Sequence, residues 1–266
     1  MLTENRLKAA IAQGRLALGL LGSVPSPLLV EMLGYAGYDF VILDQEHVGV
    51  NPETLENMLR AAECSGLTAL VRVSSSAPDG ILRALDAGAQ GVVVPRVRSR
   101  EEAEAIVRAA RYHPVGSRGI SGGRTTGFGR IPLADYLERA NREVMVVAMI
   151  EDREAVEAID AIVSVPGIDL ILEGAIDLSQ SYGVPARFDH PEVQQAIRRI
   201  AEACRRHRVP FCAIPRLPGQ AEAWSRDGAA ALLLGDDRGV AFRALKAHVS
   251  TVREELSGKQ GGPAAP

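Results

Sequence analysis

The chain has 266 residues, of which 47% are hydrophobic and 24% are charged, with a formal net charge of -3. This is the composition of an ordinary globular protein, and without a basic excess it gives no support to nucleic-acid binding. No apolar run approaches the roughly 20 residues that a helix needs to span a bilayer, and the N-terminal residues lack the apolar centre of a secretory signal. These properties predict a cytoplasmic protein without a nucleic-acid or membrane partner.

Short apolar runs alternate with longer amphipathic segments along the chain, a rhythm typical of βα units and a parallel sheet. Eight such runs predict strands at residues 16–22, 39–43, 68–72, 90–94, 144–150, 168–172, 210–214 and 230–234. Nearly every run is apolar at consecutive positions, as expected for strands that are covered on both faces. The pattern predicts an α/β fold, a parallel eight-stranded (β/α)8 TIM barrel, formed as one domain by residues 1–256.

The segments between the predicted strands carry helix signals. Asn51 and Ser99 precede amphipathic stretches as N-caps, and Gly66 suits a C-terminal stop. One connection, residues 111–131, is instead a long loop rich in Gly, Arg, Ser and Thr, and loops of this length are usually functional or mobile. Residues 257–266 have too little apolar content to build a core and are predicted to be a disordered tail.

Charged side chains follow several of the predicted strands. Because catalytic groups in a (β/α)8 barrel come from the C-terminal ends of different strands, these side chains are expected to meet at one mouth. A charged residue in such a place is more often a solvated loop residue or a helix cap, and Asp152 and Asp236 fit that interpretation. The residues expected at the mouth are Asp44, Glu46 and His47 after the second strand, Arg72 at the end of the third, Arg96 after the fourth, Glu151 after the fifth, and Glu173 and Asp177 after the sixth.

Enolate chemistry could use the arginine and the histidine of this set. Arg72 offers a planar fork for a substrate carboxylate and a fixed positive charge for a developing oxyanion. His47 titrates near neutral pH and could move a proton, with Asp44 or Glu46 fixing its tautomer.

Two carboxylates of the set come from neighbouring strands. Glu151 and Asp177 could hold a magnesium or manganese ion through oxygen ligands and several waters. Without a metal, they would be free for acid–base work. The spacing of the residues leaves both alternatives open.

Six segments sharpen this interpretation: "LDQEH", "VRV", "GAQGVVVPRV", "RYHPVGSRGISGGRTTGFG", "MIED" and "GAIDLSQSYG", in this order. They resemble the HpcH/HpaI aldolase family of the phosphoenolpyruvate/pyruvate barrel superfamily, over about residues 15–245. The resemblance implies a (β/α)8 barrel that stabilises the enolate of a 2-oxo acid and assembles as dimers within a hexamer. The family's catalytic histidine falls on His47, its substrate-binding arginine on Arg72, its metal-binding acids on Glu151 and Asp177, and its supporting aspartates on Asp44 and Asp86.

Some positions depart from the usual family pattern. The expected Gly-Pro-x-Asp turn reads Gly174-Ala175-Ile176-Asp177, and Glu173 stands where an aliphatic residue is usual. Together with "GYDFVILDQEH" and the Gly-Gly-Arg-Thr loop, this segment is similar to a subgroup, the aldolase-fold citrate synthases of siderophore biosynthesis. The resemblance to this subgroup implies condensation of oxaloacetate with the co-substrate acetyl-CoA, without a required metal.

The resulting prediction is a citrate synthase. Its substrate-binding residues are predicted to be Arg72, Glu46, Gly174, Ile176 and Arg124. The basic loop around Arg124 could meet the CoA phosphates, or it could make rim or subunit contacts. Two alternatives stay open: a metal-dependent aldolase that cleaves 4-hydroxy-2-oxo acids into pyruvate and an aldehyde, and a catalytically silent barrel that binds a 2-oxo acid. The family's assembly and the apolar positions of "VAFRALKAHV" predict a homo-oligomer, from dimer to hexamer.

Overall fold

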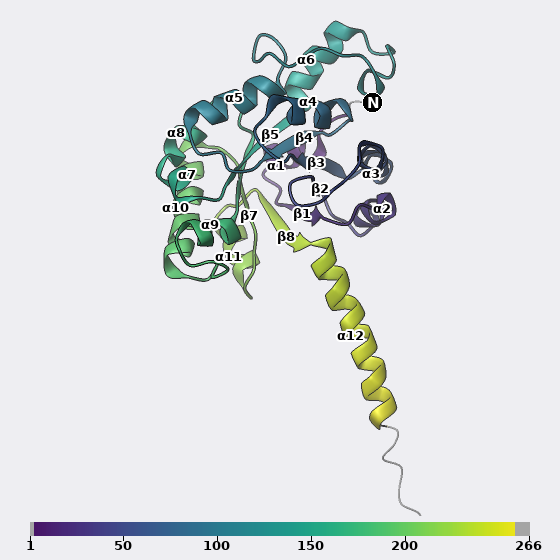
Figure 1. The fold of residues 1–266 in the computed structure, drawn as a ribbon, viewed down its shortest axis with the longest axis vertical. Coiled ribbons are helices and arrows are strands. Elements are labelled where there is room, and N and C mark those ends of the chain that lie inside the picture. The colour runs from purple at the N-terminus through teal and green to yellow at the C-terminus, as the bar shows by residue number, and fades with distance from the viewer. Residues whose placement is uncertain (1–2, 259–266) are drawn as a thin grey trace, which may run out of the picture.

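Eight parallel strands close into a barrel in the computed structural model, which describes residues 3–258 (Figure 1). The strands are β1 (Ala17–Gly22), β2 (Phe40–Asp44), β3 (Thr68–Arg72), β4 (Gly91–Val94), β5 (Met145–Ile150), β6 (Leu170–Glu173), β7 (Phe211–Ala213) and β8 (Ala231–Asp236). Each strand pairs in parallel with the next strand in the chain, and β8 pairs with β1. The predicted (β/α)8 barrel and all of its predicted strands are confirmed.

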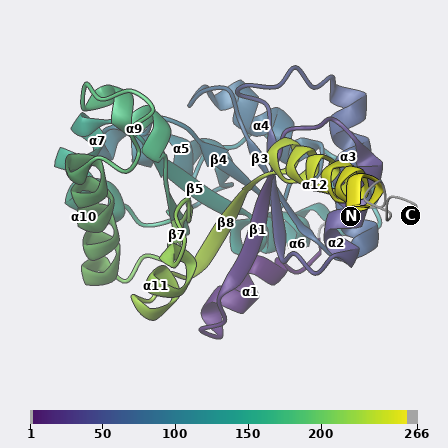
Figure 2. The ribbon, with the colours of Figure 1, turned by 90° about the horizontal axis from the view of Figure 1, so that it is seen from below.

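Helices surround the strands, as Figure 2 shows. They are α1 (Arg6–Ala12), α2 (Pro27–Tyr35), α3 (Pro52–Ser65), α4 (Pro78–Asp86), α5 (Arg100–Ala110), α6 (Leu133–Glu143), α7 (Arg153–Glu157), α8 (Ile159–Val163), α9 (Ala175–Ser181), α10 (Pro191–His207), α11 (Gln220–Arg226) and α12 (Asp237–Gly258), with a 3-10 turn η1 (Arg124–Thr126). The predicted caps are present. Asn51 accepts a hydrogen bond from the Thr54 backbone N–H at 2.9 Å, and Gly66 ends α3 with a left-handed φ of 73°.

The strands are apolar on both faces because each face meets a different core. One core lies between the strands and the surrounding helices. The other fills the barrel interior, where Phe40, Leu70 and Val93 are fully buried. Leu7 of α1 belongs to this inner core, and Lys8 forms an ion pair with Asp169 at 2.8 Å. Helix α1 therefore closes the N-terminal end of the barrel, and the C-terminal ends of the strands form the mouth.

Helix α12 projects away from the barrel (Figure 1). Its base is fixed, because the buried Asp237 accepts hydrogen bonds from the backbone N–H groups of Ser23 and Val24 at 2.9 and 3.0 Å. Ser257 and Gly258 belong to this helix. The remainder of the predicted tail, residues 259–266, lies outside the described residues.

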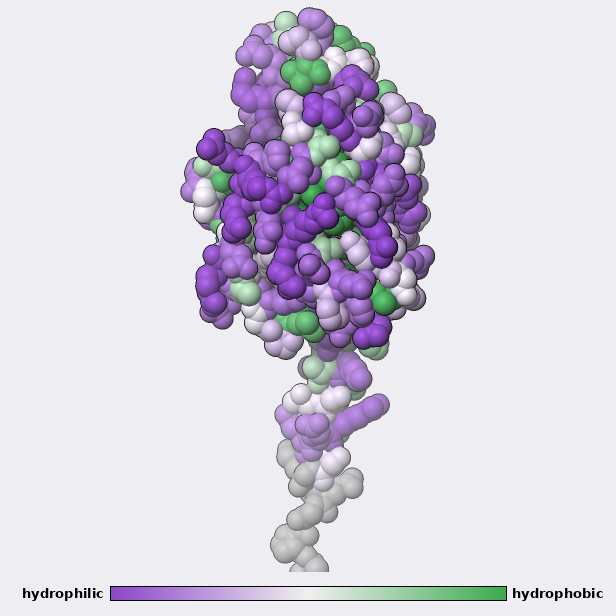
Figure 3. Space-filling view, turned by 90° about the vertical axis from the view of Figure 1, so that its left-hand side faces the viewer, coloured by the Kyte–Doolittle hydropathy of each residue, from purple (hydrophilic) through white to green (hydrophobic). Residues whose placement is uncertain are grey.

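The outer surface is largely hydrophilic, as expected from the composition of an ordinary globular protein. On the side of the body that carries α7, α8 and α10, Figure 3 shows a largely hydrophilic surface with scattered apolar residues. Within residues 3–258, none of the helices combines the length and the apolar character that crossing a membrane requires.

Candidate active site

The parallel register brings charged side chains together at the mouth. Pairing aligns Asp44 at the end of β2 with Arg72 at the end of β3. Glu151 follows β5 directly, and Arg96 follows β4 after a single proline. Contacts among these side chains and their neighbours gather six of the predicted site residues: Asp44, Glu46, His47, Arg72, Glu151 and Asp177.

A buried ion pair joins β2 to β3 at the mouth. Arg72 donates from Nε to Asp44 Oδ1 at 3.0 Å and from Nη2 to Oδ2 at 2.9 Å, and the two residues are 7% and 1% exposed. Burial by itself raises the pKa of Asp44, but the hydrogen bond and charge of Arg72, with two backbone N–H groups, bring that pKa below its ordinary value. Asp44 therefore stays ionised and holds the Arg72 guanidinium in one orientation.

Glu46 lies between Arg72 and His47. Its Oε2 is 3.3 Å from Arg72 Nη1 and 3.8 Å from His47 Nε2. Asp44 accepts the backbone N–H of His47 at 3.3 Å, and its two oxygens are engaged by Arg72. Of the two carboxylates expected to orient the imidazole, Glu46 is the one beside the ring, while Asp44 positions Arg72 and shapes the turn. The His47 side chain is 54% exposed and so is open to a substrate.

Glu151 is a buried acid whose pKa is raised above its ordinary value. Its Oε1 accepts the backbone N–H of Arg96 at 2.9 Å. Burial, followed by the negative charges of Asp177 and Glu46, raises the pKa of Glu151 to about 7. A Cβ atom on Gly174 would lie 2.5 Å from Glu151 Cβ, so only glycine lets the two backbones approach this closely.

Ile176 and Asp177, two further predicted site residues, follow β6 and lie in the first turn of α9. Ile176 is 49% exposed there, and the half-exposed Asp177 adjoins it in the sequence. Glu173, the acid noted as a departure from the family, is instead fully engaged within the protein. It accepts hydrogen bonds from the backbone N–H groups of Ile214 and Ala175, and from Arg216 Nη1 at 2.8 Å. Glu173 therefore anchors the loop after β7.

Arg96 was expected at the mouth from its place after the fourth strand, but no catalytic or binding role was predicted for it. In the structure it contacts three carboxylates of the mouth. Its Nε is 4.0 Å from Glu46 Oε1, its Nη2 is 3.9 Å from Asp177 Oδ1, and its backbone N–H binds Glu151. Its φ is 55°, a left-handed conformation that costs a residue with a side chain about 1 to 3 kcal/mol. Its place directly beyond the buried strand "GVVVP" is the sequence signal that indicated it.

Asp86 and Arg124 lie away from the mouth of their own chain. Asp86 ends α4, which leads into the start of β4, and Arg124 lies in the long loop before α6 and the start of β5. In a parallel barrel these connections lie at the N-terminal end, opposite the mouth. Asp86 pairs with Arg118 at 2.6 Å, and Arg124 pairs with Glu63 at 2.6 Å. These ion pairs therefore join both residues to neighbours other than the mouth carboxylates of the same chain.

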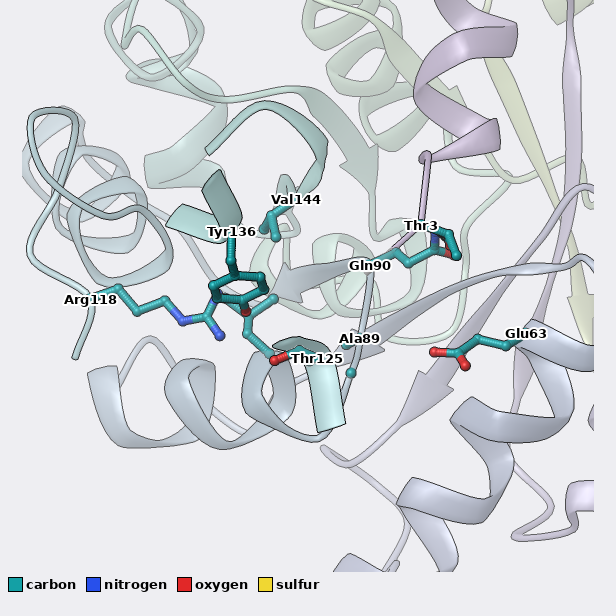
Figure 4. A pocket seen from close by; sticks show the side chains of 10 residues that line it. Thr3, Glu63, Ala89, Gln90, Arg118, Thr125, Tyr136 and Val144 are labelled. Atoms are coloured by element: carbon teal, nitrogen blue, oxygen red, sulfur yellow. Dashed lines mark hydrogen bonds between the residues drawn. The ribbon is translucent and has the colours of Figure 1, made fainter. Parts of the chain in front are cut away.

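Two hollows lie near these residues. Figure 4 shows a small cavity at the N-terminal end, lined by residues that include Glu63, Arg118, Thr125 and Tyr136. Its volume is about 10 Å³, which leaves room for about one water molecule. A larger crevice of about 620 Å³ is lined by residues of α3 and α4 and extends from Gln45 and Ser74 beside the mouth to Asp86.

Glu151 and Asp177 are the residues expected to hold a metal if one is used. Within the part of the chain that the structure describes, no group of three or more His, Cys, Asp and Glu side chains is arranged to hold a metal ion. In addition, one oxygen of Glu151 accepts a backbone N–H, and the Arg96 guanidinium lies 3.9 Å from Asp177. The donor set as it stands does not fit a resident magnesium or manganese ion, because a fixed cation already adjoins one of the two carboxylates.

Comparisons with known proteins show which family the chain matches. The model of the family described as HpcH/HpaI aldolase/citrate lyase matches residues 18–244. The 5-keto-4-deoxy-D-glucarate aldolase of Enterobacter sp. (strain 638) is 35% identical over 241 residues, which are 90% of this chain and 93% of that protein. The crystal structure of citrate synthase SbnG is 40% identical with a TM-score of 0.89, covering 96% of this chain and 100% of that one. A family member from Burkholderia cenocepacia J2315 is 30% identical with a TM-score of 0.88, covering 94% and 99%.

The buried pair predicts a stability cost for changing Arg72. Arg72→Lys keeps the charge but loses the planar fork, so buried Asp44 keeps at most one of its two hydrogen bonds from this side chain. We expect the free energy of unfolding to fall by about 3 kcal/mol, measured by urea denaturation. Arg98→Lys is the matched control, because Arg98 pairs with Asp152 on the half-exposed rim and its replacement should cost less than about 1 kcal/mol. Equal losses in the two variants would contradict this account of the pair.

Proposed function

The chain belongs to the HpcH/HpaI aldolase/citrate lyase family, and from this membership we propose that it is a citrate synthase that condenses oxaloacetate with acetyl-CoA. The observation that carries the proposal is the state of Glu151, which is buried, bound by a backbone N–H and given a pKa of about 7. The 40% identity to citrate synthase SbnG over nearly the whole chain supports the same reaction.

Glu151 has the properties of a base for this reaction. A general base works best when its pKa lies near the operating pH, because it is then both ionised and basic enough to take a proton. A pKa near 7 meets this condition. A carboxylate that ligates a metal is instead held in its deprotonated form, with its lone pairs engaged.

The other residues of the mouth supply the remaining steps. Glu151 takes a proton from the methyl group of acetyl-CoA, and the enolate carbon attacks the keto carbon of oxaloacetate. Negative charge then develops on the former keto oxygen, and the N–H groups of Arg72 that Asp44 does not accept stabilise this charge. His47 gives a proton to that oxygen, and water hydrolyses the citryl thioester to citrate and CoA.

A second candidate is a metal-dependent aldolase that cleaves a 4-hydroxy-2-oxo acid into pyruvate and an aldehyde. It is favoured by the 35% identity to 5-keto-4-deoxy-D-glucarate aldolase over 90% of the chain. In that reaction magnesium or manganese would have to bind Glu151 and Asp177, against the fixed cation beside them. We therefore rank it second.

We further assign the citrate to siderophore biosynthesis in the cytoplasm. The support is the similarity of "LEGAIDLSQSYG" and "GYDFVILDQEH" to the aldolase-fold citrate synthases of siderophore pathways. The partners of the chain would then be oxaloacetate, acetyl-CoA and further copies of itself.

The proposed homo-oligomer rests on surfaces that are apolar and uncovered in one chain. One face of α12 carries five exposed apolar side chains at alternating spacings of three and four residues, the pattern of a helix that packs along a partner. They are Phe242, Leu245, Val249, Val252 and Leu256. A second exposed face lies on α2, where Leu28, Met32 and Tyr35 are spaced as one side of a helix.

A second copy of the chain suits both faces. In a closed barrel the helix after β8 normally covers the outside of the neighbouring strands, but α12 projects from the body instead (Figure 1). Every copy therefore has both an uncovered apolar face and a projecting apolar helix. In two copies related by a two-fold axis, the projecting helix of each copy could cover the apolar face of the other, since such an interface is self-complementary.

Turnover of acetyl-CoA tests the proposed reaction. With oxaloacetate present, the protein is expected to remove the thioester absorbance of acetyl-CoA and to form citrate, identified by mass spectrometry, at a rate that EDTA leaves unchanged. The same preparation is tested for pyruvate release from 5-keto-4-deoxy-D-glucarate. Pyruvate formation that EDTA abolishes and manganese restores, without citrate synthesis, would favour the aldolase instead. Binding of oxaloacetate without either turnover would favour a silent barrel.

The pH profile tests Glu151 as the base. The base must be ionised, so kcat/KM should fall about tenfold per pH unit as the pH drops below the Glu151 pKa of about 7. Because the charge of Asp177 helps to raise the pKa of Glu151, Asp177→Asn should move this acid limb to lower pH. Asp160→Asn, on an exposed site of α8, is the control and should leave the limb in place. An acid limb unmoved by Asp177→Asn would contradict this assignment.

Sedimentation tests the assembly. The wild-type chain is expected to be a dimer or a larger homo-oligomer at micromolar concentration. The double variant Phe242→Glu, Leu245→Glu places two charges in the α12 stripe and should weaken assembly at least about 100-fold. Ala247→Glu adds a charge on the opposite side of the helix and should assemble normally. A wild-type monomer, or equal weakening by both changes, would reject the proposed interface.

A further inference from the structure

We propose that Arg96 is the resident cation of the mouth, which stands in for a divalent metal ion among Glu46, Glu151 and Asp177 and prevents such an ion from binding. The inference rests on the proposed function only in taking this mouth as the active site. The inference concerns the cation that holds the three carboxylates together. It is independent of which carbon–carbon bond is formed or broken at the site.

Arg96 is placed as a bridging cation would be. Its Nε and Nη2 atoms lie 4.0 and 3.9 Å from Glu46 and Asp177, and its backbone N–H donates to Glu151 at 2.9 Å. Within residues 3–258, Arg96 is the cationic side chain paired with Asp177. The other arginine of the mouth, Arg72, is occupied by Asp44.

The backbone holds Arg96 in this place. Its left-handed φ of 55° is unusual for a residue with a side chain, and two hydrogen bonds to the β5 segment fix the turn. One is the bond from Arg96 N–H to Glu151, and the other runs from Val97 N–H to the Met149 carbonyl oxygen at 3.3 Å. A conformation of this kind persists where the surrounding structure imposes it, and such positions cluster at functional sites.

Charge explains why the guanidinium and a metal exclude one another. A magnesium or manganese ion bound to Glu151 and Asp177 must lie about 2.1 Å from oxygens of both. The ion would then lie within a few ångströms of a guanidinium that is 3.9 Å from Asp177, and two cations so close repel strongly where water is partly excluded. Without Arg96, Asp177 would lose its paired cation, while Arg72 would stay with Asp44 and Glu46. The carboxylate oxygens of Glu151 and Asp177 are donors of the kind that these ions prefer.

Manganese binding tests the proposal directly. Purified protein is titrated with Mn²⁺ alone, and the free ion is measured by electron paramagnetic resonance, with no substrate present. Arg96→Gln removes the charge, and Arg96→Gly removes it while suiting the left-handed φ. We expect both variants to bind one Mn²⁺ roughly 100-fold more tightly than the wild type does. The double variant Arg96→Gln, Asp177→Asn should lose that gain.

The matched control is Arg98→Gln. It removes one positive charge from the same connection after β4, but Arg98 pairs with Asp152 at 2.6 Å rather than with the three mouth carboxylates. This variant should bind Mn²⁺ as weakly as the wild type. A gain in Arg98→Gln equal to that in Arg96→Gln would overturn the proposal, because net charge alone would then explain the result.

Two other outcomes would also overturn it. One is saturable binding of Mn²⁺ to the wild-type protein at micromolar concentration. This measurement does not depend on whether any variant folds. The other is the absence of any gain in folded Arg96→Gln and Arg96→Gly proteins, with folding checked by circular dichroism. Because no substrate is present, a failure of citrate synthesis leaves this test unaffected, and a failure of this test leaves the acetyl-CoA assay unaffected.

Discussion

The pairing register of β2 with β3 is the constraint on which the mouth depends. It sets Asp44 opposite Arg72 at the last pair of the ladder, where each buried charge finds its partner. A slip of one residue would turn alternate side chains to the other face of the strand and leave two buried charges unpaired, which is strongly unfavourable. The same Asp44 carboxylate accepts the backbone N–H groups of Glu46 and His47, so the position of the imidazole follows from that register.

The sequence predicted the features that depend on local pattern. Continuous apolar runs located the strands because both strand faces are buried, and Asn51 was recognised because capping is a contact over three residues. Arg72 and Glu151 were expected at the mouth because each comes at the end of an apolar run. The pKa of Glu151 was out of reach, since it arises from burial and from charges on other segments. Arg96 was expected at the mouth without a role, because its left-handed φ and its contacts with three carboxylates arise only in the folded chain.

Asp86 and Arg124 lie at the end of the barrel opposite the mouth. Asp86 was assigned from the resemblance and Arg124 from the positive charge of its loop. Both precede a strand rather than follow one, and chain order alone puts such residues at the closed end of a parallel barrel. A family pattern says that a residue takes part in a site without saying which copy of the chain contributes it. Of the residues that the resemblance assigned, the fold of a single chain brings His47, Arg72, Glu151, Asp177 and Asp44 to the mouth and leaves Asp86 away from it.

The closed end of the barrel has a consequence for how such a protein changes over time. There α1 fills the barrel with Leu7, and Lys8 binds Asp169, which also holds the buried Arg111. These contacts lie at the opposite end from Glu151, Arg96 and Asp177, so substitutions among the mouth residues leave them intact. The residues that maintain the barrel are therefore different from the residues that determine the reaction. A lineage can replace one chemistry by another in few steps while its barrel stays recognisable, as relatives named for an aldolase and for a citrate synthase at 35% and 40% identity illustrate.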